Sequence, residues 1–278
     1  MSIRIFTDSA SDITRAELEE LQAELIAMPL QCGEETYVDD KTTPVEIFWQ
    51  MLLDGVNIKT SLPSPDTFVQ KFKAAKEAGD EVICILIASK LSGTYQGAML
   101  AKQIVDYDGI HVIDAGHAAA SVAEKMLVIA ACRMRDQGCT AEEIARRLEQ
   151  LRGSVRLIAC LDTLEYLARG GRLPAAVASI GTKPIIVFGE NGEIQVVKKC
   201  MGSKRAMRDM TEMVTECRIN PEYPVIPIFA QNDRNCQEYV ASLKNAGCVG
   251  AMQVPQGIGA TIGSYIGPGG YGIVFVEK

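Results

Sequence analysis

The chain has 278 residues, of which 47% are hydrophobic and 23% are charged, and its formal net charge is −7. This balance is typical of a globular protein with one large or two ordinary domains, and it argues against a disordered chain. Basic residues form no long run, so a general nucleic-acid binder is not expected. The first residues have the pattern of a strand and not of a signal peptide, and no apolar stretch is long enough for a membrane span. We therefore expect a cytoplasmic protein.

The nine cysteines are scattered along the chain, and only two histidines accompany them. No Cys-x-x-Cys pair is present, so we expect no zinc site and no other bound metal. Cysteines inside apolar runs, such as Cys84 and Cys160, behave as small hydrophobic residues. This use of cysteine fits a reducing compartment.

Strands and helices alternate in the first half of the chain. Apolar runs predict strands at 3–6, 82–88 and 110–113, and helical periodicity predicts helices at 14–23, 66–78, 95–105 and 118–135. This alternation predicts a mostly parallel sheet with helices on its faces. The extended segments 26–32 and 36–38 flank a turn at Gly33 and predict a hairpin.

A loop rich in hydroxyl groups follows the apolar run 82–88. It contains Ser92, Gly93 and Thr94 and lies directly before a predicted helix. The start of a helix carries free backbone N–H groups and partial positive charge, so this loop is a candidate anion site at the carboxyl end of a strand. In the simpler alternative, Ser92 or Thr94 only caps the helix.

Asp8 and Asp12 lie in a second polar loop, between the first strand and the first helix. One interpretation is a metal or phosphoryl-transfer site. In the alternative, Asp12 and Thr14 cap the helix and Asp8 binds backbone groups of the loop. His117, which precedes the long helix, is likewise either an acid–base group or a residue without a catalytic role.

Thr60 and Ser61 belong to a third loop with hydroxyl groups. Pro63 and Pro65 follow, and two prolines so close together exclude regular structure and stiffen the loop. A rigid loop of this kind can face Ser92. In the alternative, the serine and proline residues only mark the start of the next helix.

The second half of the chain has a different pattern. A charged amphipathic helix is predicted at 140–151, and we place a domain boundary at its end. This gives an N-terminal α/β domain, 1–150, and a C-terminal α+β domain, 151–278. Further elements are strands at 155–160, 225–230 and 249–254, helices at 203–217 and 235–245, and a hairpin of 183–188 with 193–197. Paired glycines end a short helix before Arg172, so we expect that side chain to be exposed on a rim.

The tail of the chain is rich in glycine. Gly257 and Gly259 suggest a dinucleotide-binding loop, but the third glycine, Gly263, comes one residue late and no βαβ unit follows. We therefore reject that motif. Glycines at this density instead predict that the backbone closely approaches another group, with Ser264 and Tyr265 as the polar side chains there.

Six short motifs, in this order along the chain, resemble those of the DegV family of bacterial fatty-acid-binding proteins. They are 7–9, 60–65, 91–96, 170–172, 183–186 and 262–269. Each motif is weak alone, but six in the right order cover the whole chain. The resemblance implies two α/β domains with one long-chain fatty acid in a tunnel between them, and no metal, nucleotide or other cofactor.

The resemblance also implies which residues hold the acid. The hydroxyl groups of Thr60 and Ser92 bind its carboxylate, and Ser61, Gly93 and Tyr265 are the further candidates. A carboxylate accepts hydrogen bonds from hydroxyl and N–H donors, which these loops supply. Burial at about 0.8 kcal/mol per CH₂ provides most of the affinity for an alkyl chain of roughly 16 carbons.

In family members that act in fatty acid phosphorylation, a separate dihydroxyacetone-kinase-like subunit phosphorylates the bound acid, so such a subunit is the implied partner. Arg172, Lys204 and Arg205 are candidates for the partner surface or the ligand portal, and we do not expect Arg172 to bind the carboxylate. In the alternative, Arg172 forms a structural salt bridge. The chain departs from the family pattern at Tyr265, where a histidine is usual, and at Met201, where an arginine is usual. A phenol donates a hydrogen bond but does not readily take a positive charge near neutral pH, so these departures bear on phosphotransfer more than on lipid binding.

We therefore expect a fatty-acid carrier with no catalysis of its own. The alternatives are an enzyme, a hydrolase or kinase that uses Ser92 or Asp8, and a carrier of another amphiphile. An enzyme needs an activated base beside its nucleophile, and neither His111 nor His117 lies in a matched motif.

Overall fold

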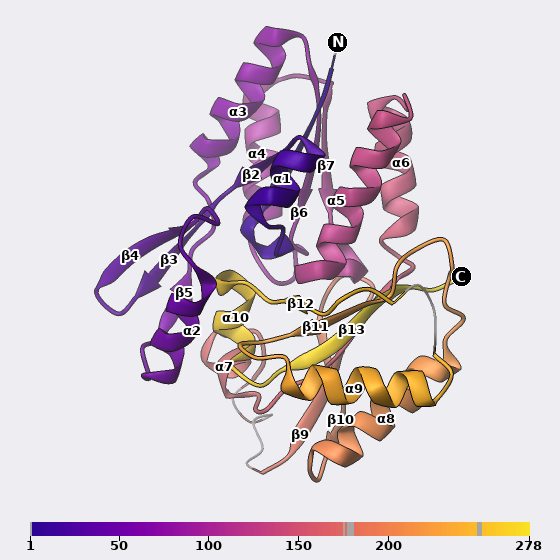
Figure 1. Ribbon diagram of the computed structural model, residues 1–278. Helices are drawn as coiled ribbons and strands as arrows, with labels where there is room; N and C mark the ends of the chain where they lie inside the picture. The colour runs from indigo at the N-terminus through magenta and orange to yellow at the C-terminus, as the bar shows by residue number, and fades with distance from the viewer. Residues whose placement is uncertain (1, 175, 177–180, 249–251) are drawn as a thin grey trace.

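The computed structural model describes residues 2–174, 176, 181–248 and 252–278. Their strands form two large sheets and one small sheet. In Figure 1 the first large sheet lies above the second, and the small sheet projects from their junction. Within the described residues, no helix is long and apolar enough to cross a membrane. The nine cysteines are free thiols.

The first sheet has four parallel strands in the order β2-β1-β6-β7. They are β1 (Ile3–Asp8), β2 (Ala23–Ile26), β6 (Glu81–Leu86) and β7 (Ile110–Asp114). The helices around them are α1 (Arg15–Leu21), α3 (Pro65–Ala78), α4 (Thr94–Val105), α5 (Ser121–Asp136) and α6 (Ala141–Leu151). The parallel sheet predicted for the first half of the chain is thereby confirmed.

Both faces of this sheet are buried, which explains the continuous apolar run of β6. Val82 and Cys84 belong to the core that α3 and α4 cover. Ile83 and Ile85 belong to the core on the other face, with α5 and α6. Successive residues of a strand point to opposite faces, so a strand that is buried on both faces is apolar at nearly every position.

The second sheet has six strands in the order β10-β9-β8-β13-β11-β12 and is antiparallel except for the pair β11-β12. The strands are β8 (Val155–Cys160), β9 (Lys183–Phe188), β10 (Ile194–Cys200), β11 (Ile226–Phe229), β12 (Gln256–Gly257) and β13 (Tyr271–Val276). The helices are α7 (Glu165–Arg169), α8 (Ser203–Glu216), α9 (Arg234–Asn245) and α10 (Ala260–Ile266). The hairpin of β9 with β10 and the α+β pattern are confirmed. Of the strand predicted at 249–254, residues 249–251 lie outside the described residues, and 252–254 belong to no named strand.

The two faces of the second sheet have different neighbours. Ile185 and Phe275 share a core with α8 and α9, which lie on the outer side of the sheet in Figure 1. Ile186 and Val274 belong instead to the core that also holds Ile83 and α5 of the first part. One apolar core therefore fills the space between the two large sheets.

The small sheet has the order β4-β3-β5 and is antiparallel. Its strands are β3 (Met28–Cys32), β4 (Glu35–Asp39) and β5 (Ile58–Thr60), and α2 (Val45–Leu53) follows β4. The hairpin predicted around Gly33 is confirmed. The segment 26–32, which we expected as one strand, divides into the end of β2 and the whole of β3, because β2 pairs with β1 whereas β3 pairs with β4 and β5.

Two helices differ from their predicted bounds. The long helix begins only at Ser121, after a 3-10 turn at Gly116–Ala118 named η2. Ala119 has a positive φ of 51°, which interrupts a regular helical backbone. The first helix ends at Leu21 because Gln22 takes the left-handed conformation and β2 follows directly.

Candidate functional site

Two adjoining cavities lie between the two large sheets. The first has a volume of about 60 Å³ and the second of about 40 Å³. The residues that line both are apolar: Ala120, Ile186, Phe188, Ile262 and Ile266. The first cavity also has polar residues in its wall, namely Thr60, Ser92, Arg172, Thr261 and Tyr265. The two cavities thus share apolar walls, and polar side chains gather in the first.

Four hydroxyl residues line the first cavity; the hydroxyl of Thr261 donates to Asp39, and the other three residues come from three separate segments. Thr60 ends β5, Ser92 precedes α4, and Tyr265 lies on α10. The Thr60 Oγ1 and Tyr265 Oη atoms are 2.5 Å apart, and either can donate the hydrogen bond. Ser92 Oγ lies 2.8 Å from Thr94 Oγ1. All three cavity residues are partly buried.

Strand geometry explains why Thr60 lines the cavity and Ser61 does not. Along β5, Ile58 is buried, Lys59 is exposed and Thr60 is again partly buried, as expected for alternating faces. Ser61 comes next and is exposed, and its N–H donates to the Pro29 carbonyl at 2.9 Å. The structure therefore does not bring Ser61 to the cavity, contrary to our expectation.

The loop before α4 is a compact turn. The N–H groups of Leu91 and Ser92 both donate to the Ala88 carbonyl, at 2.8 and 3.2 Å. Ser92 Oγ accepts from the Thr94 N–H at 3.3 Å, so the capping alternative describes part of what this hydroxyl does. Gly93 is the N-cap residue of α4, but it is exposed and does not line the cavity.

Two glycines allow α10 to approach its neighbours. A Cβ atom at Gly263 would lie 2.7 Å from the Trp49 ring, and a Cβ atom at Gly170 would overlap the Tyr265 ring. The close backbone approach predicted from the glycine-rich tail is therefore confirmed. Ser264 is buried, and its hydroxyl donates to the Thr261 carbonyl at 2.8 Å within α10.

Arg172 is not the exposed side chain that we expected. It is partly buried and lines the first cavity. Its Nε donates to the Leu91 carbonyl at 3.0 Å, and its guanidinium lies 4.4 Å from the centroid of the Tyr265 ring. Paired glycines predicted a helix end correctly, but they carry no information about the direction in which the next side chain turns.

Lys204 and Arg205 are exposed, and they lie on α8, which covers the outer face of the second sheet. Arg205 Nε lies 3.8 Å from Asp209 Oδ2. Met201, just before α8, is 75% exposed. None of these residues lines the cavities, so the structure separates them from the hydroxyl groups.

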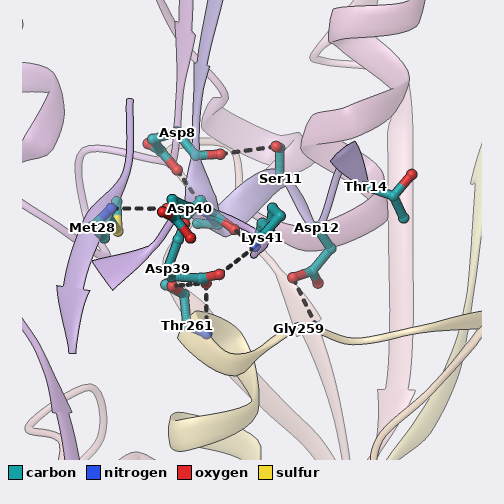
Figure 2. A network of polar contacts seen from close by, with 12 residues as sticks. Asp8, Ser11, Asp12, Thr14, Met28, Asp39, Asp40, Lys41, Gly259 and Thr261 are labelled. Atoms are coloured by element: carbon teal, nitrogen blue, oxygen red, sulfur yellow. Dashed lines mark hydrogen bonds and ion pairs between the residues drawn. The ribbon is translucent and has the colours of Figure 1, made fainter. Parts of the chain in front are cut away.

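Asp8 and Asp12 belong to a buried polar cluster (Figure 2). Thr261, which also joins this cluster through Asp39, lines the first cavity. Asp8 accepts hydrogen bonds from the N–H groups of Ala10 and Ile87, at 2.8 and 3.0 Å, which confirms that it binds loop backbone. Burial raises the pKa of Asp8 to about 7 and that of Asp12 to about 6. Thr14 caps α1, but Asp12 does not, and instead accepts from Ser121 Oγ and from Gly259 N.

The candidate acid–base residue His117 does not belong to the wall of the first cavity, where Ser92 lies. His117 Nδ1 lies 3.3 Å from Arg156 Nη1, and burial, followed by the Arg156 charge, lowers the pKa of His117. Neither histidine lines either cavity. Among the described residues, no group of three or more His, Cys, Asp or Glu side chains is placed to hold a metal ion.

Sequence reasoning missed two features of the site. Ile186, Phe188 and Ile194 form an apolar part of the cavity wall. They lie on the β9–β10 hairpin, which the sequence predicts without indicating that it borders the site. Asp39 and Lys41, which join the buried cluster, follow the hairpin arm and look like ordinary turn residues. The alternation of faces along a strand could have identified the wall residues. No local sequence pattern marks Asp39 and Lys41 as members of the buried cluster.

Comparisons with known proteins agree along the whole chain. The family model described as "Uncharacterised protein, DegV family" matches residues 2–278. A DegV domain-containing protein of Caldanaerobacter subterraneus is 32% identical over 285 residues, 99% of each chain. A protein of Thermotoga maritima named fatty acid-binding protein is 28% identical and covers 100% of this chain and 99% of its own. A solved structure described as fatty acid binding of a DegV family protein from Thermus thermophilus has a TM-score of 0.88 at 26% identity, with 100% of both chains covered. The chain therefore belongs to the DegV family.

Proposed function

We propose that this chain binds one long-chain fatty acid between its two large sheets and acts as a cytoplasmic carrier without catalysis of its own. The main support for this proposal is that polar side chains gather in the first cavity while the second is mostly apolar. Thr60, Ser92 and Tyr265 meet at the first cavity together with Arg172 and Thr261, whereas the second cavity has Ser121 and Tyr271 as its polar side chains. The Thermus and Thermotoga relatives described as fatty-acid binding support the same ligand class.

The number of hydroxyl hydrogens left free in the first cavity suits a carboxylate ligand. Thr60 and Tyr265 have two hydroxyl hydrogens between them, and their mutual bond uses only one. Ser92 and Thr94 likewise share one hydrogen in their mutual contact. Each pair therefore keeps one hydrogen for an acceptor, and a carboxylate offers two oxygen atoms. The Arg172 guanidinium, packed on the Tyr265 ring, adds positive charge beside them.

The alkyl chain would lie along the apolar walls. Volumes of about 60 and 40 Å³ are much smaller than a long alkyl chain, so the side chains between the two cavities must rotate to admit it. Ile186, Phe188 and Ile262 line both cavities and are the side chains that would move. Each buried CH₂ contributes about 0.8 kcal/mol, which offsets the cost of this rearrangement.

Native mass spectrometry of the protein as purified from cells tests the ligand class. We expect a bound mass that corresponds to a fatty acid. Titration of delipidated protein with palmitic acid and with hexadecanol then tests the head group, because only the acid offers a carboxylate to the hydroxyl groups. Failure to bind palmitic acid would overturn the proposed function, and equal affinity for both ligands would overturn the role of Thr60, Ser92 and Tyr265.

We also propose that the chain divides into domains 1–150 and 151–278 and that a dihydroxyacetone-kinase-like subunit can act on the bound acid. The strands of the parallel sheet precede residue 151 and those of the six-stranded sheet follow it, which supports the boundary. Lys204 and Arg205 are exposed and available to such a subunit. Incubation of palmitate-loaded protein with the kinase subunit and ATP should yield an acyl phosphate, and its absence would contradict the partner.

A further inference from the structure

The helix that carries Tyr265 lacks a cap from its own sequence. α10 has only seven residues, and its N-cap residue, Gly259, provides no side-chain hydrogen bond. The first N–H groups of a helix need acceptors, and a helix this short is not stable by itself. The acceptors come instead from Asp12 and Asp39, which lie more than two hundred positions earlier in the chain.

Asp39 accepts two hydrogen bonds from α10, whereas Asp12 accepts one from the residue before it. Asp39 Oδ2 accepts from both the N–H and the hydroxyl group of Thr261, at 3.2 and 2.5 Å. Its Oδ1 lies 2.9 Å from Lys41 Nζ, which also donates to the Ser9 carbonyl at 3.0 Å. Ser9 Oγ in turn donates to the Asp39 carbonyl at 2.7 Å. Figure 2 shows Asp39 between Lys41 and Thr261, so its carboxylate is fixed on both sides.

Asp12 holds the residue just before the helix. Its Oδ1 accepts from the Gly259 N–H at 2.9 Å, and its Oδ2 accepts from Ser121 Oγ at 2.5 Å. Asp12 is 6% exposed and Asp39 is 5% exposed. Carboxylates at the start of a helix also interact favourably with its dipole, and most strongly when they are partly buried.

These contacts bear directly on the ligand site because α10 forms one wall of it. Ile262, Tyr265 and Ile266 all line the first cavity. We propose that Asp39 and Asp12 are positioning residues for the ligand head: they hold the first turn of α10 on the N-terminal part of the chain and thereby set Tyr265 against Thr60. The ligand role of Tyr265 rests on the proposed function, whereas the attachment of α10 does not.

The attachment can be tested in ligand-free protein. In Asp39→Ala, amide hydrogen exchange in peptides that span 259–266 should become about tenfold faster or more, since two hydrogen bonds to a charged group are lost. Trp49, the only tryptophan, packs on Gly263, so its emission should change as well. Asp39→Asn keeps one acceptor and should fall between Ala and wild type. Asp40→Asn is the matched control, because Asp40 is exposed and its carboxylate accepts hydrogen bonds from the N–H and hydroxyl groups of Thr42.

The effect on the ligand site needs a second measurement, the affinity for palmitic acid in a double-mutant cycle. Tyr265→Phe should weaken binding in the wild-type background but have little further effect in Asp39→Asn or Asp39→Ala, because Tyr265 is already displaced there. A general loss of stability would leave the two effects additive.

Each outcome decides a separate point. Unchanged exchange at 259–266 in both Asp39 variants, or additive effects in the cycle, would overturn the positioning role. If wild-type protein does not bind palmitic acid, the proposed function fails, and the exchange data alone then decide whether Asp39 holds α10. Should Asp39→Ala not fold, Asp39→Asn and Thr261→Val, which replaces the hydroxyl donor by a methyl group, supply the same comparison.

Discussion

Replacement of Tyr265 by phenylalanine removes a single hydroxyl group from the polar end of the cavity. The ring stays, so its packing under the Arg172 guanidinium, 4.4 Å from the ring centroid, is kept. The close approach of Gly170 to the ring is kept too. The substitution therefore isolates the 2.5 Å contact between Tyr265 Oη and Thr60 Oγ1.

The expected loss depends on which hydroxyl donates to the carboxylate. If Tyr265 only orients Thr60, the variant loses one neutral hydrogen bond, about 1 kcal/mol or roughly fivefold in Kd. If Tyr265 donates to the carboxylate itself, the loss is that of a bond to a charged group, about 1.5–3 kcal/mol, or more than tenfold. We therefore expect the affinity of Tyr265→Phe to fall by roughly fivefold to a hundredfold.

Isothermal titration of delipidated protein with palmitic acid measures this change. Tyr166→Phe is the control, because the Tyr166 ring also packs beside an arginine, Arg169, but does not line the cavity. Its affinity should equal that of the wild type. Wild-type affinity in Tyr265→Phe would refute the reasoning and leave Tyr265 as a packing residue only.

Three further predictions concern other parts of the site. Arg172→Ala should lower the affinity for palmitic acid by about tenfold, because a partly desolvated cation beside the proposed head-group site is lost; an unchanged Kd would show that Arg172 does not act on the head group. Ala120→Leu adds bulk where the two cavities meet and should reduce the affinity for palmitic acid more than that for decanoic acid, so an equal loss for both acids would contradict the path of the alkyl chain. Because burial raises the pKa of Asp8 from 3.8 to about 7, the folded state binds this proton more tightly than the unfolded state does, and the resulting stability is present below about pH 4 and lost as the pH rises through 7. Relative to Asp8→Asn, the free energy of unfolding of the wild type should thus fall by roughly 4 kcal/mol between about pH 4 and pH 8 in urea titrations, and parallel pH profiles would rule this out.

Much of the fold could be predicted from local patterns. The apolar run of β6 identified a strand buried on both faces, and the hydroxyl-rich loop after it placed Ser92 at the start of α4. The glycines of the tail predicted the close packing that brings Tyr265 into the site. These features were accessible because buried strands, helix starts and tight backbone approaches each impose a pattern within a few consecutive residues.

The composition of the site was decided only by tertiary structure. Thr60 meets Tyr265 across 205 positions, and Asp39 meets Thr261 across 222. Neighbours with the same chemistry do not share the site: Ser61 is exposed beside Thr60, because adjacent strand residues face opposite ways. Arg172 turns inward after a glycine pair that left its direction open. The sequence alone determined where hydroxyl and acidic groups occur, whereas strand register and the packing of α10 on the first half of the chain determined which of them meet, since contacts between distant segments leave no periodic pattern in either one.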